Sequence, residues 1–325
     1  MKTKKTPSNL TYHDIKKATN LSIGTISRFF NQGSISQKAR AKIAAYIEKT
    51  NYQPNVGAQL IKGSENCIYV LICSLEDNAI MQIVNSIIEQ FQKQQINVYL
   101  VVGTYEPKTY LQSLKQTIKR KPKNLILFVP TLDQELRQAI NEITIKTIVF
   151  GDASTNKTSI VHNNEQYFFN LTQQILLKQK YQKLVYVGKT AEDLETGYLR
   201  LKGFQKALAK QKIKHEIVLV NENHFSYLTK TISTQQLETF NDPDLLIICG
   251  THTIFEYLWM QKMHHHYQYH LSDIGYLSKL DALANTYDYK IFIDLYYVGY
   301  VLYQKIMQQD QETFVIKEKL IDKTF

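Results

Sequence analysis

The sequence predicts a two-part α/β protein: a small three-helix domain of the helix-turn-helix type, followed by a larger core of two lobes, each built on a doubly wound parallel sheet. Three observations support this fold class. Helix caps recur in the first fifth of the chain, and that fifth also carries most of the positive charge. The remainder alternates apolar strand-like runs with amphipathic stretches, which is typical of parallel sheets covered by helices. A chain of 325 residues with 44% apolar residues can form two or three packed domains.

The positive charge is concentrated in the first 65 residues. They hold eleven Lys or Arg and three acidic residues, so this segment carries +8 of the net charge of +10. Such asymmetry is expected of a phosphate-binding module joined to a near-neutral body. A basic surface that only aids solubility is the alternative.

Capping residues predict the first two helices. Thr11 and Asp14 have the spacing of a capping box, which opens a helix that ends near Ala18. After a four-residue break, Ser22 caps a second helix that runs to Phe30.

A third helix and a linker complete the N-terminal part. Ser36 caps a helix from about Gln37 to Lys49, and helix, tight turn, helix and supporting helix is the helix-turn-helix order. A short helical stretch is expected at Val56–Lys62. We therefore assign residues 1–55 to the helix-turn-helix domain, 56–65 to a hinge helix and linker, and 66–325 to the core.

The core contains two groups of four apolar, strand-like runs. The predicted strands are 67–73, 96–102, 124–130 and 146–151 in the first group, and 183–188, 216–221, 244–250 and 273–278 in the second. We expect a first lobe of about 66–162 and 295–325, and a second lobe of about 163–294. In open α/β sheets, ligands bind beyond the carboxyl ends of the strands. The cleft between the lobes is therefore the expected small-molecule site.

Several classes of protein are disfavoured. The cysteines Cys67, Cys73 and Cys249 lie in apolar runs without metal-ligand spacing, as expected of buried, reduced thiols in a cytoplasmic protein. No stretch of about 18 apolar residues predicts a membrane span. The chain has no Gly-rich phosphate loop and no nucleophile elbow, so we expect neither an enzyme nor a bound cofactor. His264–His266 indicates a polar loop after a helix over 253–263 rather than a metal site.

With residues 25–31 (TISRFFN) and 52–55 (YQPN), the chain resembles the lactose-repressor (LacI/GalR) family of bacterial regulators along nearly its whole length. The resemblance is dense in the first 62 residues. In the core it is one of architecture, with signatures at 200–204 (RLKGF) and 274–276 (IGY). It implies a periplasmic-binding-protein-like core and a transcription regulator that binds a roughly palindromic double-stranded DNA operator as a homodimer or tetramer. A small effector, a sugar or sugar phosphate, would control it.

The resemblance also implies which residues contact DNA. Ile23, Gly24 and Arg28 match the family's base-reading positions, and an arginine can donate two hydrogen bonds to a guanine. Gly24 departs from the pattern because it has no side chain with which to read a base. Ile61 matches an apolar wedge that enters the minor groove. The remaining predicted DNA-binding residues are Thr11, Tyr12, Ser22, Thr25, Ser27, Asn31, Asn55 and Ala58. A surface ion pair is the alternative role for Arg28, and packing on the core is that for Ile61.

In the core the resemblance implies an effector site. Arg200 matches an arginine that holds the ligand from the second lobe, and its planar fork of donors suits sugars and anions. Cys73 and Ser74 end the first strand, where the first lobe contacts the ligand. Phe225 takes the place of an aromatic residue that packs on the ligand. Asp294 lies in the last crossover and would support the site. A structural ion pair is the alternative role for Arg200.

Two departures from the family bear on the effector. Leu277 stands where an acidic residue is usual, and Gly250 and Thr251 replace an Asn-Asp pair. An effector with fewer hydroxyls, or one with a phosphate held by Arg200 and Ser74, would fit better than a plain hexose. Alternatives are a nucleobase, a nucleoside or another small anion. A ligand receptor with a degenerate DNA-binding segment, or a pocket that has lost its ligand, also remains possible at this point.

Overall fold

The computed structural model describes residues 10–30, 33–52, 67–220, 228, 232–279, 281, 286–308 and 312–323. It contains two compact units, Met1–Glu65 and Asn66–Phe325, and each is described by itself. Within the described residues, no helix combines the length and the apolar composition needed to cross a membrane.

The first unit consists of three helices, α1 (Tyr12–Thr19), α2 (Ile23–Phe30) and α3 (Gln37–Thr50). All three predicted helices are confirmed, with ends that differ by a residue or so. Their shared core is formed by four buried residues, Ile15, Ile26, Ile43 and Tyr52. At least one apolar side chain from each helix therefore contributes to the core of the unit.

The caps explain where these helices begin. The backbone N–H of Thr11 donates to the carboxylate of Asp14 over 2.9 Å, as a capping box requires. Ser36 Oγ accepts from the backbone N–H of Ala39 over 3.3 Å. At the other end of α1, Asn20 adopts a left-handed conformation (φ 60°), which stops the helix.

The second unit contains two six-stranded sheets, one in each lobe. The first sheet has the order β11-β5-β4-β3-β1-β2 and the second has the order β12-β10-β9-β8-β6-β7. The strands of the first are β1 (Cys67–Ile72), β2 (Asn97–Val102), β3 (Asn124–Phe128), β4 (Lys146–Phe150), β5 (Thr158–Val161) and β11 (Phe314–Val315). Those of the second are β6 (Lys183–Lys189), β7 (Lys214–Val220), β8 (Leu245–Cys249), β9 (His270–Gly275), β10 (Tyr289–Phe292) and β12 (Lys319–Asp322).

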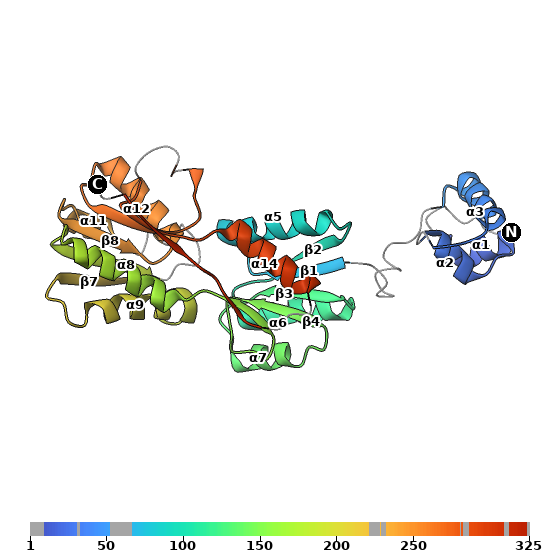
Figure 1. Ribbon diagram of the computed structural model, residues 1–325, viewed down its shortest axis with the longest axis horizontal. Helices are drawn as coiled ribbons and strands as arrows, with labels where there is room; N and C mark the ends of the chain where they lie inside the picture. The colour runs from blue at the N-terminus through green and yellow to red at the C-terminus, as the bar shows by residue number, and fades with distance from the viewer. Residues whose placement is uncertain are drawn as a thin grey trace. The chain divides into compact units, whose positions relative to one another are not determined.

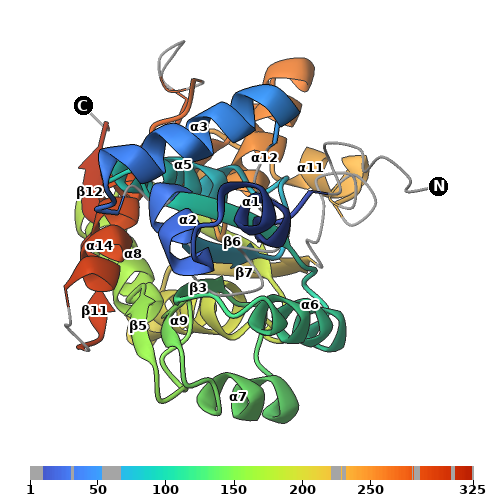
Figure 2. The ribbon, with the colours of Figure 1, turned by 90° about the vertical axis from the view of Figure 1, so that its right-hand side faces the viewer.

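Helices cover both faces of each sheet, which explains why strands such as β1, β3 and β8 are continuous apolar runs. In the first lobe, α5 (Asn78–Gln92) and α14 (Leu295–Met307) pack against each other on one face. The opposite face is covered by α6 (Pro107–Lys119) and α7 (Gln134–Asn141) (Figures 1 and 2).

In the second lobe, α8 (Asn164–Lys178) and α9 (Leu199–Leu208) pack together, and a π-helical turn (Leu194–Tyr198) leads into α9. The other helices of this lobe are α11 (Thr234–Thr239) and α12 (His252–His265). The predicted α/β class with two parallel-sheet lobes is confirmed.

The structure corrects the expected lobe boundary. The expectation placed all of 295–325 in the first lobe, but β12 pairs antiparallel with β10 in the second sheet. The chain therefore passes between the lobes three times, after β5, after β10 and after β11. The strands β5, β10, β11 and β12 have four residues or fewer, too short for apolar periodicity to predict them.

A second correction concerns the histidine run. His264 and His265 belong to the last turn of α12, and His266 ends the helix in a left-handed conformation (φ 57°), so the run is not a loop. Among the described residues, no group of His, Cys, Asp or Glu could hold a metal ion.

Candidate DNA-binding surface and effector site

Helix α2 has one buried side and one exposed side. Ile26 points into the core of the first unit, while Ser22, Gly24 and Arg28 are exposed and Ile23, Thr25 and Ser27 are half-buried. Arg28 forms no ion pair with any described residue. The side chains expected to read bases thus occupy the outer side of α2, where a duplex could reach them.

Side-chain hydrogen bonds stabilise the start of α2. Ser22 Oγ accepts from the backbone N–H of Thr25 over 3.1 Å, and the two hydroxyls lie 2.9 Å apart. Tyr12 stacks on Phe30, with ring centroids 5.4 Å apart, and so fixes α1 against the end of α2. Ser22, Thr25 and Tyr12, all predicted to bind DNA, therefore also stabilise α2, and a role in DNA binding stays a prediction for each.

Four predicted DNA-binding residues, Asn31, Asn55, Ala58 and Ile61, lie outside the described residues, as does Phe225 of the effector site. Thr11 is described and exposed, at the N-terminal end of α1.

In the core, the predicted effector residues differ in their burial and in their hydrogen bonds. Cys73 is half-buried, its thiol donates to the Phe128 carbonyl over 3.4 Å, and burial raises its pKa to about 12, so it is an unreactive packing group. Ser74 Oγ accepts from the Glu76 N–H. Asp294 caps α14 by accepting from the Tyr297 N–H over 2.9 Å. Leu277 is 59% exposed.

Arg200 is buried and held in place by its neighbours. Its Nε donates to Asn164 Oδ1 over 2.8 Å and its Nη1 to the Gly250 carbonyl over 2.6 Å. Asn164 in turn donates to Glu195 over 2.9 Å, and the guanidinium lies over the Phe168 ring at 5.6 Å. A buried, oriented guanidinium at the crossover between the lobes is suited to binding a polar ligand.

Gly250 has a structural reason to lack a side chain. A Cβ there would lie 2.7 Å from Gly188 Cα and 3.0 Å from Tyr186 Oη, and a Cβ on Gly188 would lie inside the Tyr186 ring. Tyr186 therefore fills the space that a larger residue at position 250 would need. This tyrosine comes from the neighbouring strand β6, and sequence reasoning missed it.

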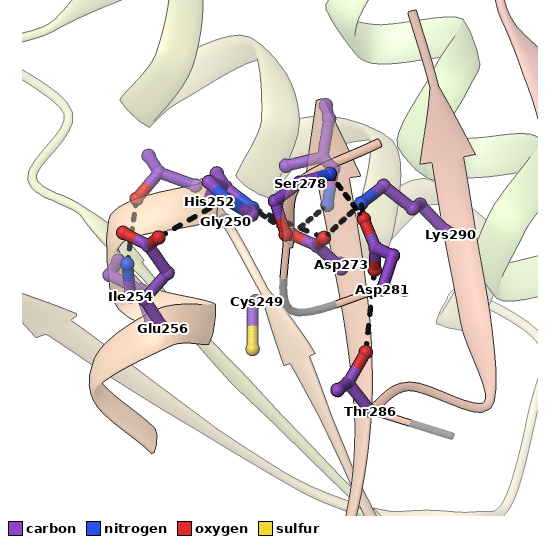
Figure 3. A network of polar contacts seen from close by, with 12 residues as sticks. Cys249, Gly250, His252, Ile254, Glu256, Asp273, Ser278, Asp281, Thr286 and Lys290 are labelled. Atoms are coloured by element: carbon purple, nitrogen blue, oxygen red, sulfur yellow. Dashed lines mark hydrogen bonds and ion pairs between the residues drawn. The ribbon is translucent and has the colours of Figure 1, made fainter. Parts of the chain in front are cut away.

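A buried charge network runs beside this site, and the sequence analysis missed it as well. Asp273 Oδ2 lies 2.7 Å from Lys290 Nζ, and Lys290 lies 2.8 Å from Asp281 (Figure 3). His252 Nδ1 lies 2.9 Å from Asp273, and His252 Nε2 lies 3.5 Å from Glu256. The sequence does contain a signal for this network, because a charged residue interrupts each of the apolar runs 271–275 (LSDIG) and 289–292 (YKIF).

The network stabilises a charged histidine. Burial alone would lower the pKa of His252, but its hydrogen bond with Asp273 and the nearby carboxylate of Glu256 outweigh burial and raise the pKa to about 9. Asp281 also accepts from the backbone N–H of Ser278 over 2.5 Å. The network thus joins the start of α12, the strands β9 and β10, and the segment that follows Leu277.

Comparisons with known proteins agree with this architecture. Residues 65–261 match the family described as periplasmic binding proteins and sugar binding domain of LacI family. The chain is 23% identical over 314 residues to the sucrose operon repressor of Staphylococcus xylosus, covering 95% of this chain and 96% of that protein.

Two solved structures have a similar fold. One is a lac repressor dimer bound to operator and the anti-inducer ONPF (TM-score 0.74, 18% identity, 95% of this chain and 98% of that one). Another is the Cra transcriptional dual regulator of Pseudomonas putida in complex with fructose 1-phosphate (TM-score 0.68, 12% identity, 80% and 99%). The family match covers more than half of the sequence, so the chain belongs to the LacI family of transcription regulators with a periplasmic-binding-protein-like core.

Proposed function

We propose that this protein is a DNA-binding transcriptional repressor of a sugar-utilisation operon. It binds a roughly palindromic operator as a homodimer, with α2 of each protomer in the major groove, and a small effector in the cleft between the lobes controls it. The outer side of α2, with exposed Ser22, Gly24 and Arg28, carries this proposal. The operator-bound structure and the sucrose operon repressor described above support it.

The electrostatics favour the same conclusion. The described cations of the first unit, Lys16, Lys17, Arg28, Lys38, Arg40, Lys42 and Lys49, are all exposed. Lys and Arg that neutralise phosphates release counterions, so affinity falls steeply with salt, with a log–log slope of about −0.9 per phosphate contacted. Two helix-turn-helix units related by a two-fold axis match two half-sites.

The test is fluorescence anisotropy of the full chain with the DNA upstream of its own gene and with scrambled DNA. We expect Arg28→Ala to weaken binding to the native DNA by about 5- to 150-fold, equivalent to about 1–3 kcal/mol for a base contact, with little change on scrambled DNA. Lys49→Ala, at the last turn of α3, is the matched control and should affect both DNAs alike. Unchanged affinity of Arg28→Ala for native DNA would count against the proposal.

Gly24 gives a second candidate function some support. Its backbone is helical, and an added Cβ would meet only Ser22 Oγ at 3.7 Å, so the fold does not require glycine there. Gly24→Ala should stabilise α2 by about 0.5–1 kcal/mol. If the native protein binds scrambled DNA as tightly as its own upstream DNA, a ligand receptor with a degenerate DNA-binding segment becomes the better assignment.

A further inference from the structure

Two neutral groups with buried polar atoms, one from each lobe, lie near Arg200: Tyr186 Oη is beside Gly250, whose carbonyl accepts from Arg200, and the charge of Arg200 acts on His162. His162 directly follows β5, and Tyr186 lies near the carboxyl end of β6. Neither His162 Nδ1 nor Tyr186 Oη has a hydrogen-bond partner among the described residues. Leaving a buried polar atom without a partner is unfavourable, so two such atoms around one oriented arginine call for a specific explanation.

Both groups stay uncharged at physiological pH. Burial, helped by the positive charge of Arg200, lowers the pKa of His162 to about 3. Burial also raises the pKa of Tyr186, against the opposing effect of Arg200. Each therefore offers a neutral donor or acceptor, which is the chemistry that recognises hydroxyl groups.

Their positions are fixed by packing. The His162 ring meets the Phe150 and Tyr167 rings edge-on, with centroids 5.6 and 6.4 Å apart. The Tyr186 ring stacks on Phe204 at 5.2 Å. These rings belong to the buried core, so both polar atoms are held in fixed positions.

The charges around Arg200 disfavour an anion. Arg200 interacts electrostatically with both Asp193 and Glu195. Burial raises the pKa of Glu195, and Asp152 of the first lobe raises it further. Asp193 and Glu195 thus both act on the Arg200 guanidinium, and Asp193 also pairs with Lys189 over 3.5 Å, so a phosphate would meet positive charges that are already compensated.

We propose that His162 and Tyr186 are effector-binding residues that, together with Arg200, select an uncharged ligand with several hydroxyls over its phosphorylated form. This inference rests on the proposed function, because it assumes that a small effector binds between the lobes. It narrows that function by excluding a sugar phosphate as the preferred effector.

The first test needs no ligand. Tyr186→Phe removes the hydroxyl and keeps the ring, so it should raise the melting temperature of the full chain by about 2–4 °C. Ser272→Ala is the matched control, because Ser272 Oγ is also buried without a described partner but lies in the middle of β9. It should give a similar rise. A lower melting temperature for Tyr186→Phe would show that the hydroxyl is already satisfied within the protein and would overturn the inference.

The second test uses calorimetric titration with sucrose and D-fructose, each against its phosphorylated form (sucrose 6-phosphate and fructose 1-phosphate). We expect an uncharged sugar to bind at least tenfold more tightly than its phosphate. Tyr186→Phe and His162→Phe should each weaken that sugar about tenfold, while Ser272→Ala should not. His162→Asn, which keeps a polar atom near the Nδ1 position, should bind better than His162→Gln.

The outcomes separate this inference from the proposed function. Tighter binding of the phosphorylated form overturns the selectivity and leaves the effector-controlled repressor intact. Failure of both sugars to bind, with operator binding preserved, overturns the inference and leaves DNA binding standing. Loss of operator discrimination in the native protein instead contradicts the proposed function itself.

Discussion

The two lobes use the same sheet order but stabilise corresponding strand pairs differently. In the first lobe, β4 and β5 pair through Val149 in register with Ser159, an apolar side chain beside a hydroxyl. In the second lobe, β9 and β10 occupy the same places in the sheet, and Asp273 is in register with Lys290. Both of these charged side chains are fully buried.

This difference makes the second lobe depend on charge. Apolar strands gain stability from burial whatever the pH. A buried ion pair holds only while both partners are present and charged, because either partner alone would remain as an uncompensated charge. The second lobe, which also holds Arg200 and Tyr186, is therefore the lobe whose stability can be changed by a single protonation.

The largest expected effect comes from breaking the buried pair. Lys290→Met should lower the free energy of unfolding by about 3–5 kcal/mol, because Asp273 and Asp281 lose their shared cation. The loss should shrink as the pH falls, since an unpaired buried carboxylate can then be protonated. The fluorescence of Trp259, the single tryptophan, which lies in α12, reports unfolding of this lobe.

The double variant Asp273→Leu, Lys290→Met is the control for that experiment. It replaces both members of the pair by apolar groups and should recover most of the lost stability. A double variant as unstable as Lys290→Met would mean that the lobe loses stability for a reason other than the unpaired charge.

An intermediate effect is expected from His252. Its folded-state pKa of about 9 lies above the ordinary value of about 6.5, so its contribution is complete below pH 6.5 and is lost as the pH rises through 9. The unfolding free energy of the native protein should fall by about 1–3 kcal/mol between these values. Urea titrations at several pH values should show a flatter profile for His252→Gln. Parallel pH profiles for the native protein and His252→Gln would show that His252 does not cause the pH dependence of stability.

The smallest effect is expected in the first lobe. Ile148→Val, at a fully buried position of β4, removes one methyl group and should lower the unfolding free energy by about 0.5–1.5 kcal/mol. Because no charge is involved, the loss measured by circular dichroism should be the same at pH 6 and pH 9. A loss that varies with pH would contradict the view that the stability of the first lobe, unlike that of the second, does not depend on charge.

The sequence predicted the elements whose signals are local. The three helices of the first unit follow from caps at Thr11, Ser22 and Ser36, and eight strands follow from continuous apolar runs. It could not predict the four short strands, because none exceeds four residues and because β11 and β12 pair with strands far away in the chain. It assigned β9 three residues too late, since Asp273 interrupts the apolar run that a strand normally shows.

The candidate site was predicted only in part. Arg200 could be assigned from its motif, and its orientation by Asn164 and Gly250 needed the structure. His162 and Tyr186 have no local motif at all. A lone histidine and a lone tyrosine in apolar surroundings are ordinary core residues until their partners, or lack of partners, are known.

By itself the sequence determined the order of the elements and the separation of a basic helical unit from a near-neutral core. These follow from patterns within a few turns of helix or strand, where periodicity and caps act. Only the tertiary structure decided which distant residues meet: the third passage between the lobes, the pairing of Asp273 with Lys290, and the approach of His162 and Tyr186 to Arg200. Such contacts depend on register and crossover, and these are set by the packing of the whole lobe.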